Sequence, residues 1–246
     1  MTYKLKFLTF FLVLTFVNQI AFCETSKKIF INDSIPHDSI PKKTVVNGSV
    51  SINNIAFAPV PAFSFNSPIL ISTLTVKRNK FTYNADLSLG LNGKPYMFNN
   101  WFRYAICSEK KINLQVSANA FLYFTPAMES KRNLSFEIMA SPRKVPFYAL
   151  YQYVEAFDSA TIGGSLINVG YQVPKITIKK SFYLRISPQI LYFNFTDNYD
   201  GLYTGVNFSI ASTKCPISIN LLTNVPIWTD FVNAGVKNKF GLMYSF

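Results

Sequence analysis

The residue types that most enzymatic mechanisms need are nearly absent from this sequence. His37 is the only histidine among 246 residues, and it stands in a polar segment near the N-terminus. Serine–histidine and aspartate–histidine mechanisms both need a histidine as base, so the rest of the chain cannot build either. A carboxylate pair from Asp86 and Glu137 is conceivable, but the segments that carry them are not neighbours in the order given below. We therefore expect no enzymatic activity.

Metal and thiol chemistry are equally unsupported. Histidines, cysteines and carboxylates do not recur at the spacing of a metal site, so we expect no metal and no other cofactor. Cys107 and Cys215 lie beside predicted turns, in segments far apart along the chain. Two cysteines do not make a disulfide framework, and we expect both to be free thiols.

The first 23 residues have the pattern of a secretory signal peptide. Lys4 and Lys6 precede the apolar run 7–17, and Ala21-Phe22-Cys23 offers small residues at alternate positions. The apolar run is too short for a membrane-spanning helix, which takes about 20 residues. Cleavage after Cys23 is the main expectation, and lipidation of Cys23 is the alternative, although Phe22 is bulky where a lipoprotein signal prefers Ala or Gly. Export argues against nucleic acid as a partner, despite the net charge of +12.

Residues 24–46 are polar, contain two prolines and four lysines, and show neither helical nor strand periodicity. We interpret them as a linker with little fixed structure. From about residue 47 the pattern changes, and strand-like alternation continues to residue 246.

Lys80 to Leu91 shows this alternation most clearly, because Phe, Tyr, Ala and Leu occupy every second position and polar residues fill the others. About twelve segments follow the same rule, and no helical stripe interrupts them. In the segment 180–195 the apolar residues change parity near Pro188, and we interpret this as a bulge. The predicted strands are 47–62, 66–77, 80–91, 95–107, 111–125, 131–142, 145–155, 162–173, 180–195, 201–212, 215–227 and 234–246.

The connections between these segments fall into two sets. One set is short and nearly always carries Lys or Arg, as in 77–80, 108–111 and 142–144. The predicted turn at 174–181 belongs to the same set. The alternate connections are mostly longer and contain Glu129, Glu155, Asp158, Asp197, Asp200 and Asp230.

The end of the chain carries a resemblance to a known class of protein. Phe240, Leu242, Tyr244 and Phe246 alternate with mostly polar residues in a segment long enough for a tilted strand to cross a membrane. A chain that stops on Phe after such a pattern resembles the closing strand of bacterial outer-membrane β-barrels. The resemblance implies that these four residues form the signal that the barrel-assembly machinery recognises.

From about residue 47 the whole chain resembles porin-like outer-membrane β-barrel proteins of Gram-negative bacteria. The resemblance implies an all-β fold, an antiparallel transmembrane β-barrel of about twelve strands, in contact with outer-membrane lipid. An even strand number and short turns at one end are typical of such barrels. The alternative is a secreted β-sandwich. It is disfavoured because the polar positions are mostly Asn, Ser, Thr, Gly and Gln, whereas a soluble sandwich needs an exposed charged face.

In a barrel, the polar positions line the interior. The charged residues at those positions carry a net charge of +2, and they are Asp86, Arg103, Glu137, Arg185, Lys237 and Lys239. The first hypothesis is a passive diffusion channel for small hydrophilic solutes, with basic residues that favour anions. The second is a closed barrel, its interior charges paired with one another, that serves as an anchor or as a subunit of an envelope protein complex. Twelve strands lie between a barrel filled by side chains and one that encloses a wide aqueous pore, so strand number does not separate the two.

Proline-containing stretches at 59–61, 92–95 and 226–228 are predicted to mark loops at the outer rim. Trp228 and Phe231 are predicted to be aromatic side chains at the membrane interface, with a role in anchoring a partner or ligand as the alternative.

Overall fold

The structure is a computed structural model that describes residues 44–55, 67–108, 112–124, 128–142, 144–157, 163–195, 199–231 and 235–246. The expected signal peptide, all but the last residues of the expected linker, His37 and the 59–61 proline stretch lie outside these residues. The described part of the chain is built from β-strands. None of its segments is a helix long and apolar enough to cross a membrane.

The strands follow one another closely along the chain. They are β1 (Val45–Asn53), β2 (Ile69–Arg78), β3 (Phe81–Gly90), β4 (Pro95–Ser108), β5 (Ile112–Phe124), β6 (Ser130–Pro142), β7 (Phe147–Ala156), β8 (Gly164–Tyr171), β9 (Ile176–Lys179), β10 (Phe182–Phe195), β11 (Tyr199–Ser212), β12 (Ile217–Thr229) and β13 (Lys237–Ser245).

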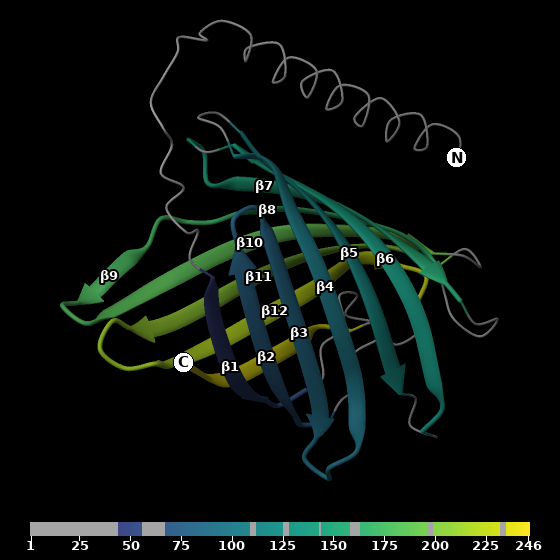
Figure 1. Cartoon of the computed structure of the whole chain (residues 1–246), viewed down its shortest axis with the longest axis horizontal. Helices are drawn as coiled ribbons and strands as arrows, with labels where there is room; N and C mark the ends of the chain where they lie inside the picture. Colours follow the sequence, from purple (N-terminus) through teal and green to yellow (C-terminus); the bar gives the residue numbers. More distant parts are fainter. Residues whose placement is uncertain are drawn as a thin grey trace, which may run out of the picture. The chain divides into compact units, whose positions relative to one another are not determined.

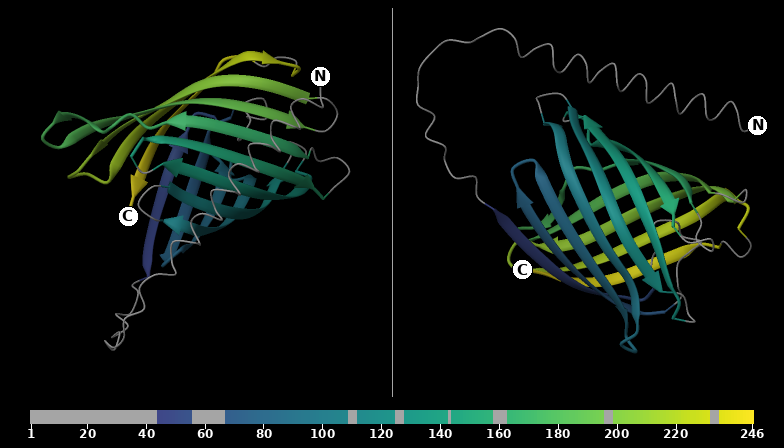
Figure 2. Two further views of the ribbon diagram at one scale, coloured as in Figure 1. Left: turned by 90° about the horizontal axis from the view of Figure 1, so that it is seen from above. Right: turned by 45° about the vertical axis from the view of Figure 1, so that its right-hand side comes forward.

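Antiparallel pairing closes twelve of these strands into a barrel. Successive strands pair from β1 to β8, β8 pairs with β10, and pairing continues from β10 to β13. The ring closes where β1 pairs with β13, in a register that runs from Ser49↔Ser245 to Asn53↔Gly241. Figures 1 and 2 show the strands from β1 to β6 curving round one side and those from β10 to β13 round the other. The predicted all-β fold, with a closed antiparallel barrel of twelve strands, is confirmed.

The barrel has two ends that differ in their connections. We call the end at which β1 begins and β13 finishes the terminal end, and the opposite end the loop end. At the terminal end, Arg78 pairs with Phe81 across a two-residue hairpin turn in which Asn79 has a φ of 57°. Asparagine tolerates this left-handed conformation better than most residues, which suits it to the tight turn.

The strand β9 is an addition to the barrel that the sequence did not predict. The segment 174–181 was expected to be a turn, but β9 continues the path of β8 after a short interruption and pairs with the first residues of β10. The Val173 N–H donates to the Ile186 carbonyl across the interruption (2.9 Å), so the chain stays beside β10 throughout. Pro174 has no N–H to donate, which accounts for the break in the ladder. The β9–β10 hairpin projects past the neighbouring barrel wall (Figures 1 and 2).

Three further local predictions are wrong. The strand β10 has no bulge at Pro188, because its register with β11 is unbroken from Phe182↔Ser212 to Phe195↔Tyr199. The stretch 226–228 is part of β12 and not a loop, with its register shift against β11 between Tyr203↔Pro226 and Leu202↔Trp228. The first predicted strand, 47–62, corresponds to a strand that ends at Asn53.

The strand registers, with shifts in four of the pairings, assign the strand residues to two faces. One face is rich in exposed, large apolar side chains and is the convex outside of the barrel. The other holds nearly all the buried polar residues and is the inside. The outside positions include Phe136 (51% exposed), Ile190 (51%) and Phe240 (52%).

The closing seam between β1 and β13 is packed on its outer side by the last residue of the chain. The ring of Phe246 lies over Gly48, and a Cβ at position 48 would overlap that ring. The backbone groups of the same two residues exchange two hydrogen bonds, of 2.8 and 2.9 Å. Glycine at this position therefore makes room for the aromatic side chain that covers the seam.

Candidate functional site in the barrel lumen

The wall of the lumen from β2 to β7 carries a network of polar side chains. Register pairs place Arg103, Ser117, Glu137 and Gln152 side by side on four adjacent strands, all pointing inward. The Ser117 hydroxyl donates to Glu137 Oε1 (3.1 Å), and Gln152 Nε2 donates to Ser135 Oγ (3.0 Å). Glu137 is only 7% exposed. A buried carboxylate needs such partners, because burial without them costs several kcal/mol.

Arg103 is the centre of this network. Its guanidinium donates to Asn84 Oδ1, and Asn84 in turn donates to Thr75 on the next strand. The guanidinium carbon also lies 4.7 Å from the centroid of the Trp101 ring, in a cation–π arrangement. Glu137 and Asp86 both interact electrostatically with Arg103. The two carboxylates that sequence analysis considered as a pair therefore both act on the charge of Arg103.

A second group of polar residues lies on β7, β8 and β10. The Tyr148 hydroxyl and Asn168 Nδ2 both donate to Gln189 Oε1, at 3.3 and 3.2 Å. The Asn168 and Asn133 side-chain oxygens are buried without a hydrogen-bond partner in the described part of the chain. Unpaired buried oxygens of this kind are normally satisfied by water, so both sites call for a hydrated interior.

The remaining predicted charges stand apart from the Arg103 network. Lys237 pairs with Asn224, and Lys239 pairs with Leu222, both across the β12–β13 register. Arg185 lies near the terminal end of β10, with its guanidinium carbon 5.2 Å from the Tyr183 ring. The structure thus brings together Asp86, Arg103 and Glu137, and it leaves Arg185, Lys237 and Lys239 on the other side of the barrel.

The predicted assembly-signal residues lie on β13 and at its end. Phe240, Leu242, Tyr244 and Phe246 face outward, where they are 47–70% exposed. The residues between them along β13 face the lumen.

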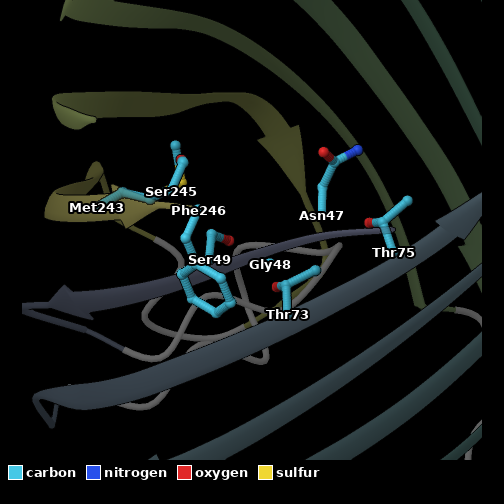
Figure 3. A pocket seen from close by; sticks show the side chains of 8 residues that line it. All are labelled: Asn47, Gly48, Ser49, Thr73, Thr75, Met243, Ser245 and Phe246. Carbon is cyan, nitrogen blue, oxygen red and sulfur yellow. The ribbon is translucent and has the colours of Figure 1, made fainter. Parts of the chain in front are cut away.

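A cavity of about 420 Å³ lies against the seam of the barrel at the terminal end. Figure 3 shows its lining, in which hydroxyl and amide side chains from β1 and β2 face Met243 and Ser245 of β13. Asn47, Ser49, Thr73 and Thr75 supply most of these polar groups. The lining has no charged side chain, so it offers hydrogen bonds without a preference for one sign of charge.

Near the loop end the inner wall changes from polar to apolar. The register that joins Glu137 to Gln152 continues through Leu166 of β8 to Phe193 of β10. Around Phe193 lies a buried cluster, which we call the inner aromatic cluster, and its members are Leu166, Leu191, Phe193, Phe195 and Tyr203. Phe193 is 0% exposed and Tyr203 is 1% exposed. Leu150 and Phe231 pack against the cluster.

Small residues make space for these large inner side chains. Phe193 lies over Gly201 on the neighbouring strand, and Tyr148 lies over Gly170. A Cβ at either glycine would overlap the ring. The rings of Phe193 and Tyr148 can therefore lie along the barrel wall. Large residues at the two glycine positions would prevent this arrangement.

Sequence analysis missed the inner aromatic cluster. It interpreted the change of parity near Pro188 as a bulge, whereas β10 is a regular strand in which Leu191, Phe193 and Phe195 lie on the inner face. Phe231 was predicted to be an interface aromatic, and it packs instead against Phe193, with ring centroids 5.5 Å apart. The glycines opposite these positions were the available signal, because Gly201 and Gly205 alternate on one face of β11.

The outer surface is the other functional surface of the barrel. Large apolar side chains are exposed on it over many strands, in contrast to the surface of a soluble protein. This is the lipid-facing surface of a transmembrane β-barrel of the outer-membrane type. Within the described ranges, no group of three or more His, Cys, Asp or Glu could hold a metal ion.

No family model matches the sequence, and no curated protein matches it. Solved structures do resemble the chain. The outer membrane channel DcaP of Acinetobacter baumannii is 10% identical, over 85% of this chain and 99% of that one, with a TM-score of 0.38. OmpT, an outer membrane protein of Vibrio cholerae, is 7% identical over 85% and 99% (TM-score 0.37). CdiB from Acinetobacter baumannii is 8% identical over 82% and 60% (TM-score 0.37).

Proposed function

We propose that this protein is an outer-membrane diffusion channel for small hydrophilic solutes. The observation that carries the proposal is the polar lining of the inner wall along the middle of strands β1 to β7. Hydroxyl, amide and charged side chains in such a lining hold water and offer hydrogen bonds to a passing solute. The buried, unpaired oxygens of Asn133 and Asn168 support a water-filled interior as well.

The charge of the lining supports a preference for anions. The carboxylates of Asp86 and Glu137 are partly offset by Arg103, whose charge both of them stabilise. Arg185, Lys237 and Lys239 stand away from those carboxylates, so their positive charge is free to act on ions in the lumen. The preferred solutes are accordingly small anions, together with neutral molecules that can use the uncharged cavity at the seam (Figure 3).

The test is the conductance of the refolded barrel in a planar lipid bilayer, under a salt gradient. We expect discrete conductance steps and a reversal potential of the sign given by anion flow. Folding is checked separately by the heat-dependent shift of a β-barrel on an electrophoresis gel. Folded protein that leaves the bilayer silent would contradict the proposal.

A second candidate function rests on the edge strand β9. Among the strands that the structure describes, β9 pairs with β10 alone, and all four of its residues are exposed. Its free edge carries backbone donors and acceptors to which an extended peptide can add as a further strand. Lys175, Lys179 and Lys180 surround the edge, so an acidic segment of an envelope protein would fit it best. The barrel would then anchor a complex at the terminal end, which is the periplasmic end in barrels of this type.

Substitution of the edge separates this candidate from the channel. Thr177→Pro places a residue without an N–H in the middle of β9, and we expect it to release a partner that co-purifies with the wild type in mild detergent. The matched control is Thr177→Val, which keeps the backbone N–H and leaves the edge intact. Purification of the wild type as a lone species would count against the anchor function and leave the channel unaffected.

A further inference from the structure

Phe231 occupies the lumen at the loop end. Phe193 belongs to the barrel wall and points inward, and the ring of Phe231 packs against it with ring centroids 5.5 Å apart. Phe231 also stacks on Tyr199, with centroids 4.9 Å apart and ring planes 3° apart. Phe231 therefore packs on the inward-facing side chains of two wall residues, one on β10 and one on β11.

The backbone on either side of Phe231 is fixed by hydrogen bonds to the wall. The Phe231 N–H donates to Thr229 Oγ1 (3.2 Å), and Thr229 Oγ1 donates to the Asp200 carbonyl (3.2 Å). The Asp230 N–H donates to that same carbonyl (3.0 Å), and the Asp200 N–H donates to the Asp230 carboxylate (3.3 Å). These bonds join the ends of β11 and β12 and hold residue 231 over the lumen.

The opposite wall at the same end is also rich in apolar residues. Ile69 is 3% exposed on the inner face of β2, and Met97 and Phe121 occupy inner positions of β4 and β5. Phe121 and Tyr123 stack on each other with centroids 6.4 Å apart. Apolar side chains therefore contribute to the lining of the loop end on both sides, beside polar neighbours such as Asn53, Ser88 and Asn133.

We propose that Phe231 and the inner aromatic cluster form a hydrophobic constriction that sets the size and polarity limit of the channel. This inference rests on the proposed channel function. A narrow apolar stretch holds water poorly, so an ion that crosses it loses hydration without a replacement ligand. Uncharged and amphipathic solutes lose less there, because an apolar group can pack on Phe231 and Tyr199. The charged lining then selects among ions, and the constriction limits how many pass.

The test compares unitary conductance in planar bilayers for the wild type, Phe231→Ala, Phe231→Leu and Phe208→Ala. Phe231→Ala removes the ring from the lumen, and we expect an upward shift in conductance. Phe231→Leu keeps an apolar side chain of intermediate size and should give an intermediate value. Phe208→Ala is the matched control, because Phe208 lies on the outer face of β11 and should leave the conductance at the wild-type value. All four are first shown to be folded by the heat-dependent gel shift.

The outcomes distinguish this inference from the proposed function. A conducting wild type with an unchanged Phe231→Ala variant would overturn the constriction and leave the channel standing. A silent wild type with a conducting Phe231→Ala variant would contradict the proposed channel function, while showing that the Phe231 ring blocks the lumen. If all four folded proteins are silent, the channel function fails and the constriction fails with it.

Discussion

At the scale of single residues, the lumen is governed by how buried charges are compensated. Glu137 has two sources of compensation, the Ser117 hydroxyl and the positive charge of Arg103. Arg103 in turn has Asn84, Trp101 and two carboxylates around it. Removing one member of this network therefore leaves the others buried without a partner. The free-energy cost of that burial is larger than the net stabilisation that the contact itself provides.

This asymmetry predicts that Glu137→Gln destabilises the folded barrel. The amide keeps the shape of the side chain but removes its negative charge, so Arg103 retains only Asp86 as an opposite charge. We expect a loss of about 1–3 kcal/mol in the free energy of unfolding, the range for a buried polar group deprived of its partner. The measurement is denaturant unfolding in lipid vesicles followed by Trp101 fluorescence, in a Trp228→Phe background that leaves Trp101 as the only tryptophan.

Glu155→Gln provides the control for this prediction. Glu155 is exposed near the loop end of β7, where its Oε2 accepts a hydrogen bond from the Tyr153 hydroxyl (2.6 Å). Surface substitutions of this kind change stability by about 0.5 kcal/mol or less. Equal effects of the two substitutions would show that Arg103 does not depend on Glu137.

At the scale of elements, the barrel depends on the seam where its first and last strands meet. The ring of Phe246 covers Gly48 there, and the seam is the point at which an incomplete barrel would remain open. Gly48→Ala places a methyl group where the ring lies. We expect a cost of about 1–3 kcal/mol in the free energy of unfolding from overpacking, and a smaller folded fraction on the gel-shift assay.

Gly235→Ala is the matched control, because a Cβ at Gly235 meets nothing within 4 Å. A Gly48→Ala protein that folds as completely as the control would show that Phe246 can move aside.

The strands could be predicted from the sequence because apolar and polar residues alternate with the same two-residue period as the outward and inward faces of a strand. The β3 segment illustrates this, since Lys80 to Leu91 was predicted and Phe81–Gly90 is observed. Prediction failed where the inner face is itself apolar. In β10 the residues Leu191 and Phe193 look like outward residues, and only their pairing with β8 and β11 reveals that they face inward. A proline was equally misleading, because Pro226 stands in a strand at a bulge, where its missing N–H does no harm.

The same limit applies to the candidate site. The sequence predicted which charged residues occupy polar positions, since parity alone assigns them. It could not predict that Arg103 would stand between Asp86 and Glu137, because that depends on the register of four strands. Nor could it predict the place of Phe231, which follows from hydrogen bonds between Asp200, Thr229 and Asp230.

At the scale of the whole molecule, the lumen combines a polar middle with an apolar loop end, and the two parts have separable effects. The constriction determines the unitary conductance. The cationic residues that lie away from the carboxylates determine which ion carries most of the current. Of the six charged residues predicted to line the lumen, Lys237 and Lys239 lie together on β13 without a carboxylate opposite them in the β12 register. Substitution of these two lysines should therefore change ion preference and leave the Arg103 network intact.

We expect the Lys237→Gln, Lys239→Gln double variant to lose most of the anion preference, because the net charge of the six inner residues falls from +2 to 0. Glu137→Gln should act in the opposite sense and strengthen the preference, provided that the variant is folded. The measurement is the reversal potential under a salt gradient, at low and at high ionic strength. The difference between the variants should shrink at about 1 M salt, where the screening length is only about 3 Å.

A reversal potential that the double variant leaves unchanged at low salt would place the selectivity elsewhere, with Arg185 as the remaining cation to test. A change in unitary conductance without a change in reversal potential would mean instead that the lysines act through the width of the lumen, and the division of roles between its two parts would be wrong.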